Sequence, residues 1–179
     1  MKLYLVRHAI AEERSATADA GRASAVKAKG KPATPDAERA LTPQGKAKMV
    51  RAAQGLRKIK VRPDAILTSP LRRARETAEI LADGLGGIKI EVLEELAPGT
   101  ELFSVVAALR RYHGLKALAL VGHQPDLGYL ASFLLAGTPS ACNLSFRKGS
   151  VACLEGELSD NATGCSLVWL LPPKLLRTL

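Results

Sequence analysis

The sequence predicts an α/β fold, a three-layer α/β/α sandwich around a mostly parallel mixed sheet, and three observations lead to this prediction. Short apolar runs of strand length alternate with helix-forming segments over the first three quarters of the chain, which is typical of a parallel sheet covered by helices. Two further apolar runs follow each other near the C-terminus without a helix between them, which predicts an antiparallel pair at the sheet edge. The length of 179 residues suits a single domain over residues 1–179.

The first apolar run, Leu3–Val6, has the length and composition of a buried strand. Residues 11–40 follow, a long basic segment without clear apolar periodicity. We expect a surface excursion here, because loops of this length in compact domains are usually functional flaps or disordered. A helix then starts at Thr42-Pro43, where a capping hydroxyl precedes a proline in the first turn. Its predicted inward face consists of Ala47, Val50, Ala53 and Leu56.

The next three elements are a strand, a helix and a strand. Ala65–Thr68 is a short apolar run, and Ser69-Pro70 starts the second helix by the same capping logic. Ile88–Leu93 alternates apolar and charged side chains, which is typical of a strand. The predicted inward face of the second helix, which ends near the glycines at 84–87, consists of Ala74, Thr77, Ala78 and Leu81.

Two more helices flank the most apolar strand, Ala117–Val121. Thr100 is expected to cap the third helix and Asp126 the fourth, which Gly137 ends. The inward faces are Leu102, Val105, Val106, Leu109 and Tyr112 in the third helix, and Leu127, Leu130, Leu134 and Leu135 in the fourth. The terminal strand pair is Ser150–Leu154 and Cys165–Leu170, joined through the turn-rich segment Ser159–Gly164.

The composition excludes several classes of protein. No apolar run approaches the ~18 residues of a membrane span, and the apolar start of the chain is too short for a secretory signal. Cys142, Cys153 and Cys165 form no CxxC pattern, so we expect small buried hydrophobes rather than disulfides or a zinc site. These observations predict a cytoplasmic protein without membrane association.

The charge balance narrows the class of partner. Lys and Arg number 26 against 17 Asp and Glu, which gives a net charge of +9. A basic surplus suits nucleic acids, acidic protein surfaces or phosphorylated substrates. Aromatic residues make up only 4% of the chain, which argues against a platform for single-stranded nucleic acid, because such platforms stack bases on aromatic rings.

Unusual polar residues follow three of the predicted strands. Arg7-His8 end the first strand, residues 69–73 (Ser-Pro-Leu-Arg-Arg) follow the second, and Gly122-His123 follow the strand at 117–121. Ligands of open α/β sheets bind at the carboxyl ends of the strands. If these strands are neighbours, histidines and arginines converge there, and such a cationic cluster requires an anion. A phosphoryl group fits best, because guanidinium groups match its oxygens and a helix N-terminus adds N–H donors.

The same residues resemble the motifs of the histidine phosphatase superfamily, which includes the cofactor-dependent phosphoglycerate mutases. Leu5–Ala9 is similar to its Arg-His-Gly signature, Ser69–Ala78 to its second element and Val121–His123 to its second catalytic histidine. Arg39–Gly45 matches a further common element. The resemblance implies a phosphoglycerate mutase-like fold. The chain is most similar to the SixA-type phosphohistidine phosphatases, because it is short, carries Glu94–Gly99 after the third strand and has Gly122–Pro125 before an apolar helix.

The resemblance also implies the roles of individual residues. His8 would be the nucleophile that becomes phosphorylated, while Arg7, Arg73 and His123 would hold the phosphoryl oxygens. Motif register favours Arg73 over Arg72 for this role. No metal or other cofactor is expected, because the cationic side chains supply the charge.

Each of two further candidate site residues, Ser69 and Glu95, has two possible roles. Ser69 is expected to cap the second helix, with a hydroxyl that also reaches the site. Glu95 matches the position of the family's acid glutamate, and its alternative role is that of a partner for Arg7 or Arg73. Two positions depart from the family pattern: Ala9 stands in place of glycine and Glu76 in place of glutamine. Neither change removes a catalytic group.

The predicted function is therefore that of a phosphatase with a phosphohistidine intermediate, acting on the phosphohistidine of a signalling or phosphotransfer protein. An uncapped site admits a protruding side chain, and a basic surface favours an acidic partner. The first alternative is a small-molecule phosphatase or mutase for sugar phosphates, nucleotides or a cofactor precursor, with residues 11–40 closing over the site. The second is a nucleic-acid-binding module, against which the pair of histidines argues. The expected partner is a phosphorylated protein or a small phosphate ester; the sequence leaves the oligomeric state open.

Overall fold

The computed structural model describes residues 1–13, 35–157 and 164–179. Most of the excursion predicted over residues 11–40 and most of the turn predicted at Ser159–Gly164 lie outside these ranges. No helix within them is long and apolar enough to cross a membrane.

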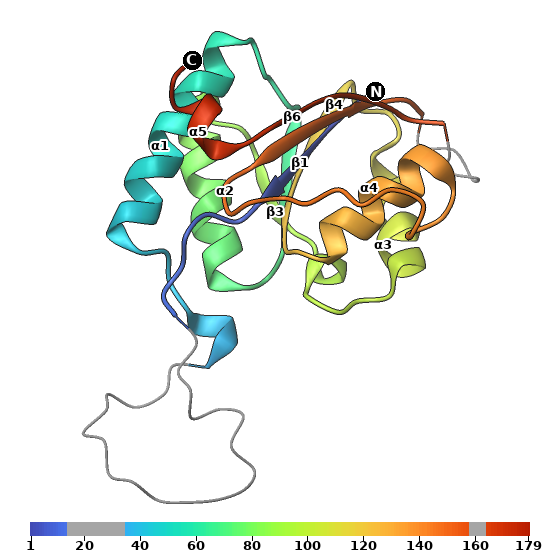
Figure 1. Ribbon diagram of the computed structural model, residues 1–179, viewed down its shortest axis with the longest axis horizontal. Helices are drawn as coiled ribbons and strands as arrows, with labels where there is room; N and C mark the ends of the chain where they lie inside the picture. The colour runs from blue at the N-terminus through green and yellow to red at the C-terminus, as the bar shows by residue number, and fades with distance from the viewer. Residues whose placement is uncertain (14–34, 158–163) are drawn as a thin grey trace, which may run out of the picture.

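A six-stranded mixed sheet forms the middle layer, with the strand order β3-β2-β4-β1-β5-β6 (Figure 1). The first four strands in the chain run parallel, and β5 and β6 are antiparallel, as the sequence predicts. The strand bounds are Lys2–Arg7 for β1, Ala65–Thr68 for β2, Ile90–Val92 for β3, Ala117–Gly122 for β4, Val151–Glu155 for β5 and Ser166–Leu171 for β6.

The strand order brings the three strands with polar ends side by side. In β1, Arg7 is paired with Gly122 of β4, and in β2, Thr68 is paired with Val121 of β4. The carboxyl ends of β1, β4 and β2 therefore meet at one edge of the sheet. The predicted meeting of residues 7–8, 69–73 and 122–123 depends on this arrangement.

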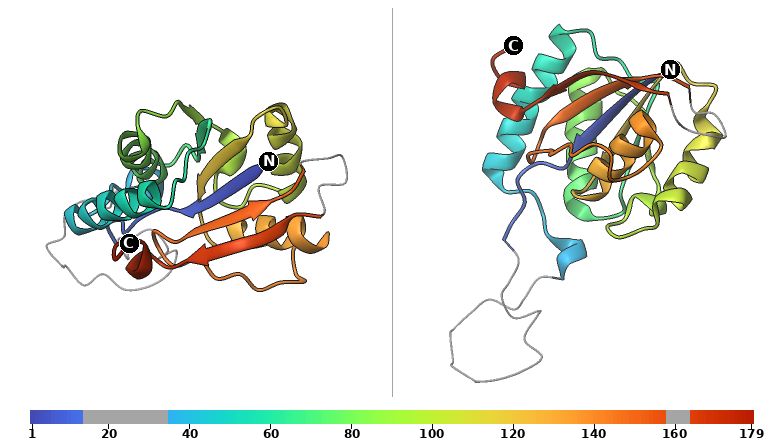
Figure 2. Two further views of the ribbon diagram at one scale, coloured as in Figure 1. Left: turned by 90° about the horizontal axis from the view of Figure 1, so that it is seen from above. Right: turned by 45° about the vertical axis from the view of Figure 1, so that its right-hand side comes forward.

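Helices cover both faces of the sheet, which gives the predicted three layers (Figure 2). One face packs against α1 (Pro43–Lys58), α2 (Arg72–Leu85) and α5 (Pro173–Leu176), and the other against α3 (Leu102–Leu109) and α4 (Asp126–Ala136). Strand side chains alternate between these two cores: Leu118 and Leu120 of β4 belong to one, and Ala119 and Val121 to the other. Three 3₁₀ turns complete the described elements: η1 (Asp36–Glu38), η2 (Glu94–Leu96) and η3 (Arg110–Tyr112). The sequence did not predict α5 or η1.

The inward face of α1 differs from the prediction. Ala47 and Val50 are exposed. The buried stripe is instead Gly45, Met49, Ala52, Ala53, Gly55 and Leu56. The predicted cap of this helix is confirmed, because the Thr42 hydroxyl accepts a hydrogen bond from the Gly45 N–H at 3.0 Å.

Three other predicted caps are wrong. The second helix begins at Arg72 rather than Pro70, and the third helix has Glu101 rather than Thr100 at its N-cap. The Thr100 hydroxyl donates to the Ala97 carbonyl at 2.9 Å instead. Asp126 is the first residue of α4 and not its cap. The predicted end of α4 is confirmed, because Gly137 has a φ of 75° in the left-handed region.

Candidate active site

Five of the predicted site residues come together at the carboxyl ends of β1, β2 and β4. The rings of His8 and His123 lie 5.1 Å apart between centroids. Ser69 contacts His123, and the charges of Arg7 and Arg73 act on both histidines. His8, His123 and Arg73 are only 6%, 4% and 4% exposed, respectively. Two arginines and two histidines therefore share one largely buried volume.

The ring of His8 is fixed in one neutral form by the backbone. Its Nδ1 lies 2.7 Å from the Ala9 carbonyl oxygen, and because a carbonyl can only accept, Nδ1 carries the hydrogen. The lone pair is then on Nε2. Burial and, after it, the charges of Arg73, Arg7 and Lys148 together lower the pKa of His8 to about 4, although the Ala9 carbonyl opposes them. At neutral pH His8 is an uncharged imidazole with a free electron pair.

His123 is held by a side chain from the neighbouring strand. Its Nε2 lies 2.8 Å from the hydroxyl oxygen of Ser69, which also accepts the Leu71 N–H at 3.3 Å. Burial lowers the pKa of His123 to about 3, together with His8 and Arg73, while Asp36 acts in the opposite direction. Its buried Nδ1 has no hydrogen-bond partner in the described part of the chain. When Nδ1 carries the hydrogen, it can donate to an anionic oxygen.

Arg7 is anchored by the segment that leads into β5. Its Nη1 donates to the Phe146 carbonyl at 2.5 Å, and its backbone N–H donates to the Ser150 carbonyl at 3.1 Å. The Gly149 N–H donates in turn to the carbonyls of both Arg7 and His8, at 3.1 Å each. Residues 146–150 thus fix the pair that carries the predicted nucleophile.

Arg73 is held by an acidic residue that the sequence analysis missed. Its guanidinium donates to the Asp36 carbonyl at 2.7 Å and to the Asp36 carboxylate at 3.1 Å. The same carboxylate accepts the Arg39 Nε–H at 2.9 Å. The only indication of this residue in the sequence was that Asp36 precedes Arg39 by three positions, a spacing that allows an ion pair. Arg72, by contrast, is exposed and pairs with Glu76 at 3.1 Å.

The two departures from the family pattern have structural explanations. The Ala9 N–H donates to the Thr77 hydroxyl at 3.1 Å, and that hydroxyl donates to the Arg73 carbonyl at 2.6 Å. The φ of Ala9 is not positive, so its methyl group causes no backbone strain. Glu76 lies beside the site: it accepts the Leu41 N–H at 2.7 Å and pairs with Lys46 at 3.3 Å.

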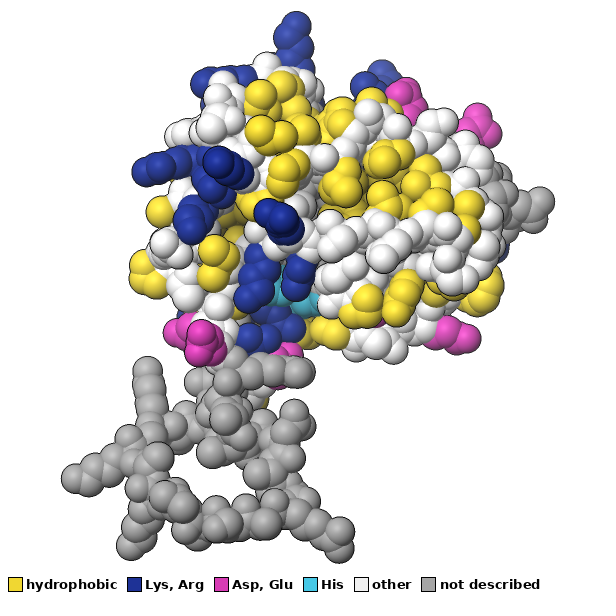
Figure 3. All heavy atoms as spheres, viewed as in Figure 1, with side chains coloured by type: hydrophobic (Ala, Val, Ile, Leu, Met, Phe, Trp, Pro, Cys, Tyr) yellow, Lys and Arg dark blue, Asp and Glu magenta, His cyan; other side chains and the backbone are white. Residues whose placement is uncertain are grey.

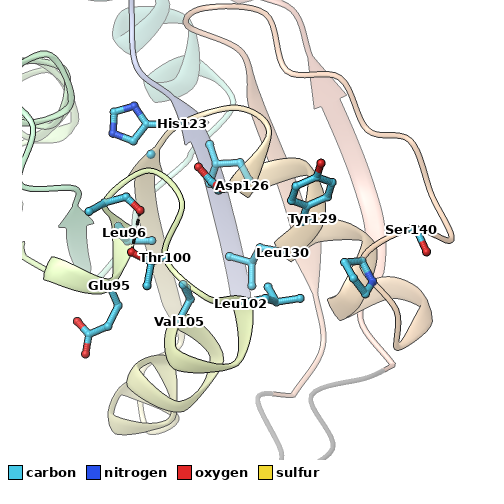
Figure 4. A pocket seen from close by; sticks show the side chains of 14 residues that line it. Glu95, Leu96, Thr100, Leu102, Val105, His123, Asp126, Tyr129, Leu130 and Ser140 are labelled. Atoms are coloured by element: carbon cyan, nitrogen blue, oxygen red, sulfur yellow. Dashed lines mark hydrogen bonds between the residues drawn. The ribbon is translucent and has the colours of Figure 1, made fainter. Parts of the chain in front are cut away.

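Glu95 is the predicted residue that the structure does not bring to the cluster. It lies in η2, and its carboxylate is 3.8 Å from the guanidinium of Arg111 rather than beside Arg7 or Arg73. Figure 4 shows this carboxylate pointing away from His123. The carboxylate of Glu95 therefore contacts neither Arg7 nor Arg73.

Glu95 and His123 nevertheless line one pocket of about 260 Å³ between α3 and α4 (Figure 4). Its walls are mainly apolar and include Leu102, Leu130 and Tyr129. Asp126 also lines it, nearer to His123 than Glu95 is (Figure 4). Burial raises the pKa of Asp126, while hydrogen bonds from backbone N–H groups lower it. Asp126 was predicted only as a helix cap, and its position three residues after His123 was the available signal.

In the ranges that the structure describes, no group of three or more His, Cys, Asp and Glu side chains is placed to hold a metal ion. The positive charge of the described residues at the cluster comes from Arg7 and Arg73, because both histidines are neutral at neutral pH. A largely buried cationic pocket of this kind suits an oxyanion with several oxygens.

Comparisons with known proteins identify relatives of the chain. A family model described as the histidine phosphatase superfamily (branch 1) matches residues 3–98. An uncharacterized protein from Picosynechococcus sp. is 36% identical over 157 residues, which are 87% of this chain and 85% of that protein. The phosphohistidine phosphatase SixA of Escherichia coli is 32% identical over 135 residues, which are 73% of this chain and 81% of that protein.

The fold is also similar to that of a solved structure. The protein histidine phosphatase SixA complexed with tungstate matches with a TM-score of 0.78 and 25% identity, over 98% of this chain and 99% of that one. This match confirms the predicted α/β fold of the phosphoglycerate mutase type.

Proposed function

The chain belongs to the histidine phosphatase superfamily, and from this membership we propose that it hydrolyses a phosphoryl group through a phospho-His8 intermediate. The observation that carries the proposal is the Nδ1–H of His8 held by the Ala9 carbonyl. It leaves Nε2 as a neutral nucleophile inside a cationic pocket. Arg7, Arg73 and His123 are the proposed holders of the phosphoryl oxygens, and Ser69 positions His123.

The proposed reaction has two steps. In the first, Nε2 of His8 attacks phosphorus, the bond to the leaving group breaks, and the leaving atom takes a proton. In the second, water attacks phosphorus, the bond to Nε2 breaks, and inorganic phosphate leaves. The arginines stabilise the charge on the equatorial oxygens in both steps, and positioning supplies much of the rate.

The proposed substrate is a phosphohistidine on a signalling or phosphotransfer protein in the cytoplasm. The relative from Escherichia coli is named a phosphohistidine phosphatase. Glu95 does not point at the cluster (Figure 4), and an imidazole leaving group, which is easily protonated, demands little of an enzyme acid. The three cysteines are free thiols, as expected for a reducing compartment.

A second candidate is a small phosphate ester, and the pocket beside His123 favours it. Its volume of about 260 Å³ is enough for a small leaving group next to the phosphoryl site. Hydrolysis of an alkyl ester requires an acid, because an alkoxide is a poor leaving group. Asp126 and Glu95 are the two carboxyl groups that line this pocket.

The mechanism is tested by removing the nucleophile. We expect His8→Ala to lower turnover by at least about 10³-fold and to abolish the acid-labile phosphoenzyme seen when wild-type protein is quenched during turnover with ³²P-labelled substrate. Circular dichroism should show an intact fold. Substantial activity of the variant would exclude phospho-His8 as an intermediate.

The substrate is tested by a side-by-side assay. One substrate is a phosphohistidine-bearing phosphotransfer domain, and the others are a panel of small phosphomonoesters. A kcat/KM preference for the protein supports the signalling proposal. A preference for one small ester rejects it in favour of the metabolic alternative.

A further inference from the structure

A second pocket, of about 240 Å³, lies beside α1 and α5, on the face of the sheet opposite to the pocket beside His123. Residues that directly follow His8 line it, together with the first half of α1 and the start of α5. We refer to it as the basic pocket, because five of its lining residues are cationic and none is acidic. The five are Lys48, Arg147, Lys148, Lys174 and Arg177.

The cations of the basic pocket are not neutralised by any carboxylate in the described part of the chain. None of the five forms an ion pair with any residue that the structure describes. Lys46, Arg39 and Arg111, which lie outside this pocket, each pair with a carboxylate. Figure 3 shows Lys and Arg side chains gathered around the few histidine atoms that are visible on this face. A concave surface with one sign of charge concentrates anions of the opposite sign.

The basic pocket is joined to the active site by a short rigid segment. Arg147 and Lys148 lie between Phe146, whose carbonyl accepts from Arg7, and Gly149, whose N–H donates to the His8 carbonyl. The segment that fixes the nucleophile therefore also presents two of the pocket's cations. The charge of Lys148 also lowers the pKa of His8, so this residue of the pocket acts on the predicted nucleophile.

One wall of the basic pocket is formed by the backbone next to the nucleophile. Ala9 and Ile10 lie in this wall, and Met49 and Ala52 of α1 complete its apolar floor. The wall of the basic pocket therefore begins at the residue directly after the nucleophile.

We propose that the basic pocket is a second anion-binding subsite, which holds another anionic group of the same substrate whose phosphoryl group is transferred to His8. The inference rests on the proposed function only in placing the phosphoryl group at His8. The ligand chemistry is an oxyanion, a carboxylate or a phosphate. A carboxylate would come from an acidic side chain near a phosphohistidine, and a phosphate would come from a small substrate with two phosphate groups.

The test compares matched substrates rather than single rates. One pair is a phosphohistidine peptide with Asp and Glu beside the phosphohistidine, and the same peptide with Asn and Gln there. The other pair is a sugar bisphosphate and its monophosphate. The readout is the ratio of kcat/KM within each pair, so that any general effect on His8 cancels.

Two double variants remove the same amount of charge. K148A/K174A removes two of the five cationic side chains of the basic pocket. The control, K89A/K116A, changes two exposed lysines that precede β3 and β4 at the opposite end of these strands. In wild type and control we expect the anionic member of one pair to be preferred by about tenfold or more, as for a charge-assisted contact. In K148A/K174A the ratio should fall to about one.

Each outcome decides the proposal. Ratios close to one for both wild-type pairs, or an equal fall in both variants, would overturn the subsite. A preference in the peptide pair identifies a carboxylate, and one in the sugar pair identifies a phosphate. If wild type leaves the peptides unhydrolysed, the protein substrate is wrong, and the sugar pair still tests the subsite.

Discussion

At the scale of residues, one backbone hydrogen bond decides which nitrogen of His8 can react. Because the partner of Nδ1 is the Ala9 carbonyl, no side-chain substitution removes it. The sequence predicted Arg7, His8 and His123 because each lies at the end of an apolar run, and it predicted Arg73 from the register of a family motif. It missed Asp36, since the contact with Arg73 joins positions 37 residues apart and depends on the folded path between them.

Two adjacent arginines give a sharp prediction at this scale. Arg73→Ala should lower kcat/KM by about 10²–10³-fold, because a buried donor to the phosphoryl oxygens is lost. Arg72→Ala should change kcat/KM less than about threefold, because an exposed pair with Glu76 contributes only a few tenths of a kcal/mol. Steady-state kinetics on one substrate measures both. The reverse ranking would place the phosphate-binding role on Arg72.

The two carboxyl groups of the pocket beside His123 are also distinguishable. Asp126→Asn should lower kcat on an alkyl phosphate by about 10²-fold, as expected when a general acid is lost. Glu95→Gln should change it less than about threefold, because its carboxylate points toward Arg111. A phosphohistidine substrate serves as the comparison, since its leaving group needs less help. A larger loss in Glu95→Gln would restore Glu95 as the acid.

At the scale of elements, the start of α1 braces the chain just after the nucleophile. The Ile10 carbonyl accepts the Thr42 N–H at 3.0 Å, and Gly45 packs directly against it. A Cβ on Gly45 would lie 2.1 Å from the Ile10 oxygen, so only glycine allows this close approach. The helix therefore sets the position of the segment that follows His8.

Substitution of this glycine tests the brace. Gly45→Ala should lower the free energy of unfolding by about 1–3 kcal/mol, as overpacking does, and should reduce kcat, because the segment after His8 must shift. Urea unfolding and steady-state kinetics measure the two effects. Gly114→Ala is the control, since a Cβ on Gly114 would meet no other described segment within 4 Å; we expect it to stay within about 0.5 kcal/mol of wild type. Equal stability of both variants would contradict the brace.

Elements were easier to predict than their ends and faces. The strands and the four long helices follow from apolar periodicity, and the fold class follows from their order. The prediction that Ser69 caps the second helix is wrong, because its hydroxyl contacts His123 and the helix starts three residues later. The predicted buried face of α1 is wrong, because Met49 and Ala52 are buried rather than Val50. Tertiary contacts decide both features, and these contacts cannot be inferred from the spacing of neighbouring residues in the sequence.

At the scale of the whole molecule, the two buried histidines link stability to pH. Their pKa values, about 4 for His8 and about 3 for His123, lie below the ordinary value of 6.5. Below pH 6.5 the unfolded chain takes up protons that the folded chain does not. The stability that comes from keeping these rings neutral is therefore lost as the pH falls from about 6.5 toward 4.

The expected size of this effect for His8 is about 2–3 kcal/mol between pH 7 and pH 4.5. Urea unfolding of wild type and His8→Gln at both pH values measures it, because glutamine cannot take up the proton. Wild type should lose more stability on acidification than the variant by this amount. An equal loss in both proteins would mean that His8 titrates alike in the folded and unfolded states.

The anchoring of Arg7 and His8 by residues 146–150 also has a consequence for synthesis on the ribosome. The nucleophile is made long before its anchor, the Phe146 carbonyl and the Gly149 N–H, because Arg7 and Phe146 are 139 positions apart. A growing chain that has exposed every element from β1 to α4 still lacks this anchor. The predicted nucleophile is therefore fixed in place only after residues 146–150 have emerged, and shorter growing chains lack this anchor.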